Sequence, residues 1–294
     1  MAEGKSRHGF LNDAMNASCY RGRLAPSPTG FLHLGHARTF WTAFQRAQNA
    51  RGTLILRNED LDPARSKSQF VSAMIEDLHW LGISWVEGPD CGGSFGPYSQ
   101  SQRGDLYRSA FEKLRKGHFI YPCTCSRQDV QKALHAPHAA DDEPIYPGTC
   151  RNNTFDIIGN RKVNWRFRVP DGETIRFVDA HFGPQEFVAG RDFGDFVVWR
   201  ADNVPSYQLA VVVDDALMKI TEVVRGADLL LSTARQILLY NALGWEPPSF
   251  FHCPLMTDAS GIRLAKRNDA LSLRTLRENG TMPTDLQRQF LTGF

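Results

Sequence analysis

The sequence predicts an α/β fold in which a parallel sheet is interrupted by an antiparallel, cysteine-containing insertion. Residues 20–24 lead through a Pro/Gly turn into a helical pattern, and residues 53–56 form the next buried apolar segment. After residue 119 the pattern changes, and alternation of apolar and polar residues at 163–178 indicates antiparallel strands. The strand-and-helix pattern returns after residue 205. We therefore expect two α/β halves with an insertion between them.

The composition is that of a folded protein with two domains, or one domain with an insertion. The chain has 294 residues, 42% hydrophobic and 22% charged, with a formal net charge of +2. A nucleic-acid-binding face would therefore depend on local clustering of basic residues. No apolar run approaches the roughly 20 residues that span a bilayer, so we expect no membrane association. The first 16 residues lack the apolar core of a signal peptide, so we expect a flexible extension at 1–18 and a cytoplasmic location.

Two histidines stand where the first strand passes into the first helix. The turn at 26–30 reads Pro-Ser-Pro-Thr-Gly, and His33 and His36 follow it at the start of the helical pattern. Unpaired N–H groups and the positive end of the helix dipole make such a place a receptor for phosphate. Gly35 would let a nucleotide approach the backbone closely. An isolated H-x-x-H is more typical of a metal site or of a helix start at the surface. The preceding Pro-Ser-Pro-Thr-Gly turn makes this instance a more specific indication of a phosphate-binding site.

Charged residues follow the strand predicted at 53–56. Glu59 and Asp60 stand at its carboxyl end, where open α/β sheets place ligand contacts, although a solvated turn that caps the next helix is the alternative. One helix is predicted at 68–81 and another starts at 99–103. The side chains expected on the buried face of the second helix are Leu106, Tyr107, Ala110, Phe111 and Leu114.

The cysteines indicate a metal site rather than a disulfide framework. Of six cysteines, Cys123 and Cys125 form a C-x-C pair, and Cys150 follows after a polar stretch. Three thiolates suit a tetrahedral Zn²⁺ site whose fourth ligand stays open. Coordination chemistry offers three ordinary candidates for it and one unusual one: His118, His135, His138 and Tyr146. Three reduced structural cysteines with no metal are the alternative.

The insertion is predicted to contain antiparallel strands. Residues 163–169 and 174–178 alternate on either side of an Asp-Gly turn, which predicts a hairpin with one apolar face and one face bearing Arg and Asn. A second strand pair is expected near 185–188 and 196–200. The basic face could contact a nucleic-acid backbone, or it could be a solvated sheet surface.

The second α/β half contains two further apolar segments that end in charged residues. An apolar block at 206–215 closes with two aspartates, and the strand at 219–226 ends in Arg225. Ser232 is expected to cap a helix that ends at Gly244, and a short strand follows at 250–253. The loop after it carries three basic residues, Arg263, Lys266 and Arg267, and such a loop is ordinarily solvated.

Together these segments resemble the class I aminoacyl-tRNA synthetases of the glutamyl type, from Arg23 to about Asp269. His33-Leu34-Gly35-His36 matches the HIGH motif, and the segment at 263–267 occupies the KMSKS position. The resemblance is strongest to the short glutamyl-queuosine tRNA(Asp) synthetases. About twenty-five residues follow the KMSKS-like loop, which leaves no room for an anticodon-binding domain, and the C-x-C…Y-x₃-C pattern is that of their zinc site. The blocks Y-Q-L-A-V-V-V-D-D and E-V-V-R-G-A-D-L also resemble that branch.

The resemblance implies a Rossmann-like parallel sheet with an inserted, zinc-containing α+β subdomain. The two catalytic halves would be 19–117 and 193–245, with the zinc insertion at 118–192. The KMSKS-like loop and a C-terminal helical segment would occupy 246–294.

The resemblance also implies a role for each motif residue. The catalytic residues would be His33, His36 and Lys266. Glutamate would be bound by Arg23, Ala25, Ser27, Glu59, Tyr207 and Arg225. ATP, accompanied by Mg²⁺, would contact Pro28, Thr29, Gly30, His33, Gly35, His36 and Lys266. One structural Zn²⁺ would be held by Cys123, Cys125, Tyr146 and Cys150.

The implied activity is modification of tRNA rather than charging of its 3′ end. Glutamate would be activated by ATP to glutamyl-AMP and transferred to queuosine at the wobble position of tRNA(Asp) by a monomeric enzyme. A truncated glutamyl-tRNA synthetase that charges 3′ ends and a non-catalytic zinc-dependent RNA-binding paralogue are the alternatives. The KMSKS-like loop departs from the motif, because Ala265 and Arg267 stand where it has serines. Arg263 replaces the first lysine and keeps its charge.

Overall fold

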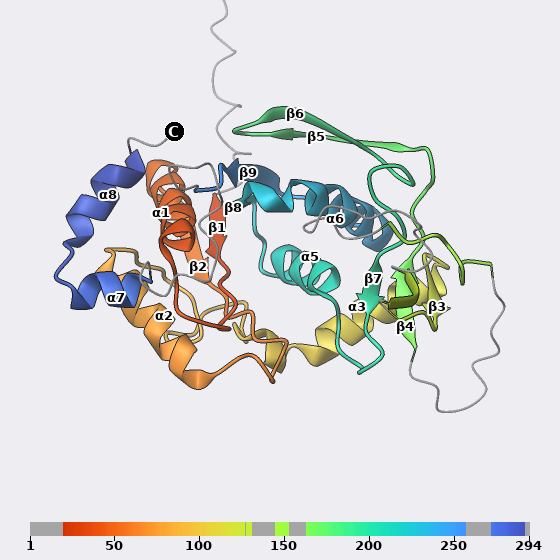
Figure 1. Cartoon of the computed structure of the whole chain (residues 1–294), viewed down its shortest axis with the longest axis horizontal. Coiled ribbons are helices and arrows are strands. Elements are labelled where there is room, and N and C mark those ends of the chain that lie inside the picture. The colour runs from red at the N-terminus through yellow and green to blue at the C-terminus, as the bar shows by residue number, and fades with distance from the viewer. Residues whose placement is uncertain (1–19, 127, 131–144, 153–162, 257–271, 292–294) are drawn as a thin grey trace, which may run out of the picture.

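The computed structural model describes residues 20–126, 128–130, 145–152, 163–256 and 272–291 (Figure 1). Several predictions therefore lie outside the described residues. These are the extension at 1–18, the basic loop with Arg263, Lys266 and Arg267, and two of the candidate metal ligands, His135 and His138.

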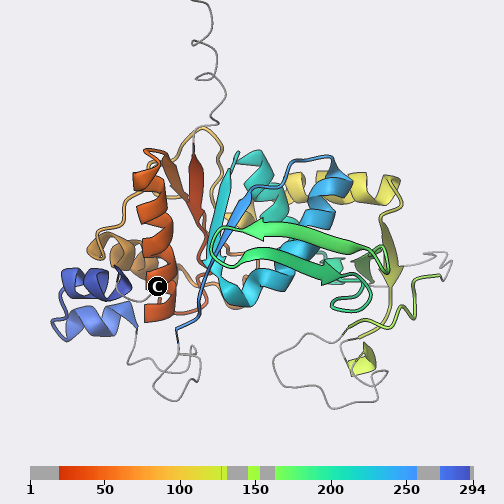
Figure 2. The same ribbon diagram turned by 90° about the horizontal axis from the view of Figure 1, so that it is seen from above.

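The first α/β unit forms as predicted. Strands β1 (Arg21–Leu24) and β2 (Thr53–Leu56) pair in parallel, and helix α1 (Leu34–Asn49) connects them. Apolar side chains of both strands are fully buried, as expected for parallel strands that are covered on both faces. Helices α2 (Ser68–Trp80), α7 (Leu273–Glu278) and α8 (Pro283–Leu291) lie at the same end of the molecule (Figures 1 and 2).

The second α/β unit places two more parallel strands beside β1. Strand β8 (Glu222–Gly226) pairs with β9 (Ser249–Cys253), and the N–H of Thr221 donates to the carbonyl of Arg21 at 2.9 Å. Helix α6 (Leu230–Leu243) ends at Gly244, whose left-handed conformation favours glycine. The predicted cap at Ser232 is wrong, because this residue lies inside α6 and is buried.

The apolar block of the second half is a helix. Its sequence left the choice between helix and strand open, and the structure shows α5 (Tyr207–Leu217), with the Ser206 hydroxyl accepting a hydrogen bond from Leu209 N. Helix α3 (Gly104–Lys116) begins after a short 3₁₀ turn at Gln100–Gln102. The expectation that Leu106 is buried is wrong, since this side chain is 38% exposed.

The predicted hairpin between residues 163–169 and 174–178 is wrong. Strand β4 (Asn164–Phe167) pairs instead with β3 (Ile120–Cys123) and β7 (Val197–Trp199) in a three-stranded sheet. Strand β5 (Thr174–Asp179) pairs with β6 (Gly183–Val188), so the second predicted pair is also wrong. The turn between the two alternating runs does bend the chain, but Gly172 N donates to Ala189 O and so joins the turn to the end of β6. Alternation predicts a half-buried strand and not its partner.

The β5–β6 hairpin extends the sheet of β8 and β9, which has the strand order β6-β5-β9-β8. Its only parallel contact with β9 among the described residues pairs Asp179 with Phe250, next to a hydrogen bond from Ala180 N to Phe250 O. From that junction the hairpin runs away from β8 toward the end of the molecule that holds β3, β4 and β7 (Figures 1 and 2). Strands β8 and β9 are parallel as predicted, and the antiparallel strands of the predicted insertion extend the same sheet and make it mixed.

No helix in the described part of the chain combines the length and apolar character needed to cross a bilayer.

Candidate active site

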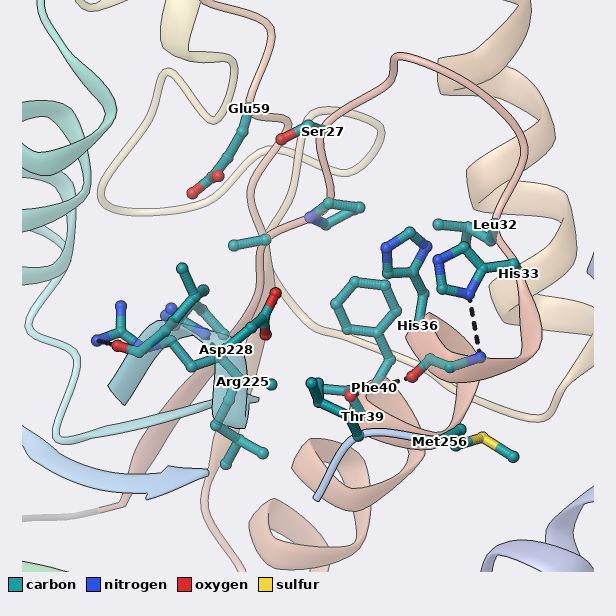
Figure 3. Close-up of a pocket in the computed structure, with 18 of the residues that line it drawn as sticks. Ser27, Leu32, His33, His36, Thr39, Phe40, Glu59, Arg225, Asp228 and Met256 are labelled. Carbon is teal, nitrogen blue, oxygen red and sulfur yellow. Dashed lines mark hydrogen bonds between the residues drawn. The ribbon is translucent and has the colours of Figure 1, made fainter. Parts of the chain in front are cut away.

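A cavity of about 380 Å³ opens where β1, β8 and the start of α1 come together. It is lined by most of the residues that the sequence predicted for glutamate and ATP: Arg23, Ala25, Ser27, His33, Gly35, His36, Glu59, Tyr207 and Arg225. Figure 3 shows His33 and His36 on one side and Glu59, Arg225 and Asp228 on the other. Side chains from distant parts of the chain thus meet around one space large enough for a small ligand.

The two histidines lie at the N-terminus of α1. His33 is the N-cap residue, and its Nδ1 accepts a hydrogen bond from Gly35 N at 3.1 Å. The imidazole of His36 stacks on that of His33, with ring centroids 3.7 Å apart. A Cβ atom at Gly35 would lie 3.1 Å from the His33 ring, so glycine allows this capped arrangement. The helix therefore presents its N-terminal N–H groups and two imidazoles to the cavity.

Two contacts between distant parts of the chain hold Ser272 and Leu273 next to the first histidine. His33 forms a β-bridge with Ser272, and Leu273 N donates to Leu32 O at 2.7 Å. The Ser272 hydroxyl then caps α7 by accepting from Thr275 N. Ser272, the first described residue after position 256, therefore lies beside the first histidine.

The opposite side of the cavity carries two buried arginines. Arg23 donates to Val224 O at 3.0 Å and to Asp215 at 3.3 Å. Arg225 lies on the neighbouring strand β8, and its Nη1 donates to Gln236 at 2.8 Å. Both side chains are at most 5% exposed, so their charges act in a low-dielectric setting.

Glu59 lies in the same wall and is not part of a solvated turn. It is 9% exposed and accepts a hydrogen bond from Arg57 Nη2 at 3.1 Å. Burial raises the pKa of the Glu59 carboxyl, while the charges of Arg57 and Arg23 oppose that rise. Asp60 instead accepts hydrogen bonds from Ser101, so the turn alternative describes Asp60 and not Glu59.

A buried charge network that the sequence did not predict supports this wall. Arg57 is fully buried and lies 2.6 Å from Asp215 and 3.6 Å from Asp214. Asp214 in turn accepts from Arg103 at 2.6 Å and from Tyr107. Buried charges are tolerated only when each is paired in this way. The signal in the sequence was the pair of aspartates that closes an apolar block, but their partners lie more than a hundred residues away.

Some residues predicted to contact ATP lie elsewhere. Pro28, Thr29 and Gly30 do not line the cavity among the described residues, and Thr29 borders a second cavity of about 770 Å³. That second cavity shares Ser27, Glu59 and Tyr207 with the first. Its wall also carries four arginines, Arg65, Arg166, Arg200 and Arg235. The two cavities therefore adjoin through a common wall.

The three clustered cysteines come together as a candidate metal centre. The sulfur atoms of Cys123, Cys125 and Cys150 lie within 4.8 Å of one another. The Tyr146 hydroxyl lies 3.3 Å from Cys123 Sγ and 3.6 Å from Cys125 Sγ. His118 is not among the described metal-ligand groups, whereas Tyr146 stands within this one. Three thiols and a phenol in this arrangement fit a soft divalent cation.

A buried arginine borders the cysteine cluster. Arg166 Nε donates to Cys123 Sγ at 3.3 Å, and its guanidinium lies 3.9 Å from the Tyr146 ring centroid. This corrects the prediction of a basic sheet face, because Arg166 is 8% exposed and directed toward the cysteines. Burial tends to raise the pKa of the Cys150 thiol, but hydrogen bonds from Tyr146 and Thr124 outweigh it and lower the pKa to about 7. A thiol with such a pKa readily supplies the thiolate that a metal requires.

The family model of class I tRNA synthetases (E and Q), catalytic domain, matches residues 20–292. The chain belongs to this family. This match and the two relatives described next confirm two predictions, the synthetase-type ligase activity and the resemblance to the glutamyl-queuosine branch. The chain is 52% identical to a glutamyl-Q tRNA(Asp) synthetase of Symbiobacterium thermophilum, over 89% of this chain and 82% of the relative. It is 47% identical to the protein of the same name from Nitratidesulfovibrio vulgaris, over 88% and 82%.

Full-length glutamate ligases resemble this synthetase over a smaller share of their length. It is 42% identical to a glutamate–tRNA ligase 2 of Nitrosococcus oceani, over 92% of this chain and 58% of the ligase. The glutamate tRNA ligase of Elizabethkingia meningosepticum, solved in complex with its amino acid, matches with a TM-score of 0.74 and 32% identity. That match covers 85% of this chain and 52% of the solved one. The class I synthetase catalytic fold is therefore established for this chain.

Proposed function

We propose that this synthetase activates L-glutamate with ATP and transfers it to queuosine at the wobble position of tRNA(Asp). The observation that carries the proposal is the single cavity in which two histidines at a helix N-terminus face two buried arginines and a glutamate. The relatives named glutamyl-Q tRNA(Asp) synthetase, at 52% and 47% identity, support the choice of acceptor.

The arginines and Glu59 are chemically suited to an acidic amino acid. Arg23 and Arg225 can each donate a charge-assisted hydrogen bond to a substrate carboxylate, and Glu59 can accept from the ammonium group. Tyr207, Ala25 and Ser27 complete the wall. Glutamine would be rejected, because an amide in place of a carboxylate loses a charge pair and turns N–H donors toward an arginine.

The histidines are suited to the phosphates of ATP. An oxygen of the substrate carboxylate attacks the α-phosphorus, the bond to pyrophosphate breaks, and glutamyl-AMP stays bound. His33 and His36 hydrogen-bond the phosphates at the helix N-terminus, and Lys266 neutralises charge on the departing pyrophosphate. Mg²⁺ enters with ATP and neutralises charge on its phosphate oxygens. Catalysis then depends mainly on placement and charge rather than on proton transfer.

The second cavity offers room for the acceptor. It adjoins the glutamate side through Ser27, Glu59 and Tyr207, and its two exposed arginines, Arg65 and Arg200, suit a nucleotide backbone. A hydroxyl of the cyclopentene-diol of queuosine attacks the acyl carbon there, and AMP leaves. Cys123, Cys125, Tyr146 and Cys150 would hold one structural Zn²⁺, which would link the segments that carry these four residues. A monomeric state and a cytoplasmic location stay predictions.

Two assays test the proposal. ATP–pyrophosphate exchange that depends on glutamate, with no tRNA added, is expected if the cavity forms the adenylate. Transfer of labelled glutamate is then compared on tRNA(Asp) with and without queuosine, and only the modified tRNA should be labelled. Equal labelling of both would favour charging of 3′ ends, which the similarity to glutamate–tRNA ligases makes the second candidate. No exchange at millimolar substrates would favour a non-catalytic RNA-binding protein.

A further inference from the structure

The Arg225 guanidinium is held by a histidine that does not line the cavity. Arg225 Nε donates to His252 Nε2 at 3.1 Å, and its Nη2 donates to Thr233 Oγ1 at 2.7 Å. His252 lies on β9, is fully buried and is absent from the cavity wall. The histidine therefore contacts the arginine from behind, on the side away from the ligand space.

The other ring nitrogen of His252 contacts a buried carboxylate. His252 Nδ1 lies 2.6 Å from Asp179 Oδ2, and the backbone N–H of His252 donates to the same carboxylate. Asp179 also accepts from the backbone N–H groups of His181 and Phe182, so its orientation is determined by four contacts. Because an ionised carboxylate can only accept, this geometry assigns the imidazole proton to Nδ1.

The position of that proton decides whether His252 Nε2 presents an acceptor or a donor to Arg225 Nε. With the proton on Nδ1, Nε2 has a free lone pair and accepts the Arg225 Nε–H. A proton on Nε2 could be accepted by Thr233 Oγ1 at 3.2 Å, but the Arg225 Nε–H would then face another donor at 3.1 Å and lose its buried acceptor. Burial and the charge of Arg225 lower the pKa of His252 to about 4, which keeps the ring neutral near pH 7.

We propose that Asp179 and His252 are positioning residues that orient Arg225 for an acidic substrate side chain. The chain Asp179–His252–Arg225 selects one tautomer of the imidazole and thereby holds the guanidinium in place at the cavity wall. Asp179 ends strand β5 at its junction with β9, so the β5–β6 hairpin contributes to the amino-acid pocket although none of its residues lines it. The inference rests on the proposed function, in which Arg225 binds a glutamate carboxylate.

The kinetic test separates glutamate binding from ATP binding. In ATP–pyrophosphate exchange, His252→Phe keeps a ring but removes the ring's contacts with Asp179, Arg225 and Thr233, and Asp179→Asn allows the wrong tautomer. We expect the KM for glutamate to rise at least about tenfold in His252→Phe and several-fold in Asp179→Asn. The KM for ATP should stay within about twofold. His252→Gln, which offers an acceptor near the place of Nε2, should restore part of the loss.

A matched control lies on the same hairpin. Arg176 is on β5 and forms an exposed pair with Glu186 on β6 at 2.7 Å, so Arg176→Gln should leave both KM values unchanged. Circular dichroism and thermal melting show whether each variant keeps the fold. An unchanged KM for glutamate in folded His252→Phe, or an equal rise in the KM values for glutamate and ATP, would overturn the positioning role.

A second readout does not depend on activity. In protein labelled with ¹⁵N-histidine, long-range ¹H–¹⁵N NMR should show His252 with a protonated Nδ1 and a bare Nε2 near pH 7. A protonated Nε2 would overturn the inference whatever the kinetics. If the wild-type protein shows the expected tautomer but no glutamate-dependent exchange, the proposed function fails, and with it the claim that the array serves glutamate.

Discussion

His36 is the residue at which the proposed phosphate contact is most directly tested. Its ring stacks on His33 at the start of α1, where the positive end of the helix dipole favours an anion. We expect His36→Ala to lower the rate of glutamate-dependent pyrophosphate exchange by about a hundredfold or more, since it removes one preorganised donor to transition-state charge. Circular dichroism should show an unchanged fold. Near-normal exchange would remove this histidine from the mechanism.

Cys125 is the residue at which metal binding is most simply tested. It is the most exposed member of the group with Cys123 and Cys150, and its loss leaves two thiols and a phenol. We expect Cys125→Ala to release the metal, with zinc content measured by atomic emission falling from about one equivalent to a small fraction of it. Cys91→Ala is the control, because Cys91 is exposed and outside the described cluster. Equal zinc content in both variants would refute the ligand assignment.

At the scale of elements, the contact between α2 and α7 contains a buried carboxylate. Asp77 is fully buried on α2, and its nearest cation is Arg277 of α7 at 3.5 Å. Neither oxygen of Asp77 has a hydrogen bond among the described residues. Burial raises the pKa of Asp77 from 3.8 to about 6. The contact therefore includes a group that is less costly to bury when it is protonated.

The direction of this pKa shift predicts how stability depends on pH. Between about pH 4 and pH 6 the folded state binds more protons at Asp77 than the unfolded state, so its contribution to stability decreases as pH rises. We expect Asp77→Asn to raise the free energy of unfolding at pH 7 by about 1–2 kcal/mol, after a reduction for solvent screening. Below about pH 4 the gain should vanish.

Urea unfolding at pH 4 and pH 7 measures this difference. Glu76→Gln is the matched control, because Glu76 is exposed and pairs with the same arginine, Arg277, at 3.5 Å. Its effect should be below about 0.5 kcal/mol at both pH values. The same stability gap for Asp77→Asn at pH 4 and at pH 7 would show that titration of Asp77 is not its cause.

At the scale of the whole molecule, one buried cation joins the two α/β halves. Arg57 follows β2 in the first half, and its partners Asp214 and Asp215 lie on α5 in the second. Because all three side chains are almost wholly shielded from solvent, losing Arg57 leaves Asp214 with Arg103 and Asp215 with the more distant Arg23 as their remaining cations. We expect Arg57→Met to lower the free energy of unfolding by about 3–5 kcal/mol, measured by urea titration.

A surface arginine provides the comparison for Arg57. The side chain of Arg65 is 72% exposed and pairs with Asp62 three residues earlier, so Arg65→Gln should change stability by less than about 0.5 kcal/mol. A cost below about 1 kcal/mol for Arg57→Met would mean that the buried aspartates find other compensation. The halves would then be joined by apolar packing rather than by this network.

The helices, strands and motifs that depend on residues close together in the sequence could be predicted from the sequence. The period of apolar residues predicted α1 and α2, and β1, β2 and β8 followed from short apolar runs. The turn before His33 and the C-x-C pair marked the candidate site and the cysteine cluster. Their chemistry could be predicted because the residues of each motif are close together in the sequence.

Tertiary structure alone decided which strands pair and which charges meet. Strand β4 joined β3 and β7 instead of β5, and this carried Arg166 from an expected surface into the cysteine cluster. Glu59 is buried and accepts a hydrogen bond from Arg57, and His252 contacts Asp179, which lies 73 residues earlier in the chain. The alternation and charge of a segment indicate that it requires a strand partner or an opposite charge. They do not indicate which distant segment provides that partner. Burial of apolar surface selects the partner, and the buried polar groups are then limited to the contacts that this partner provides.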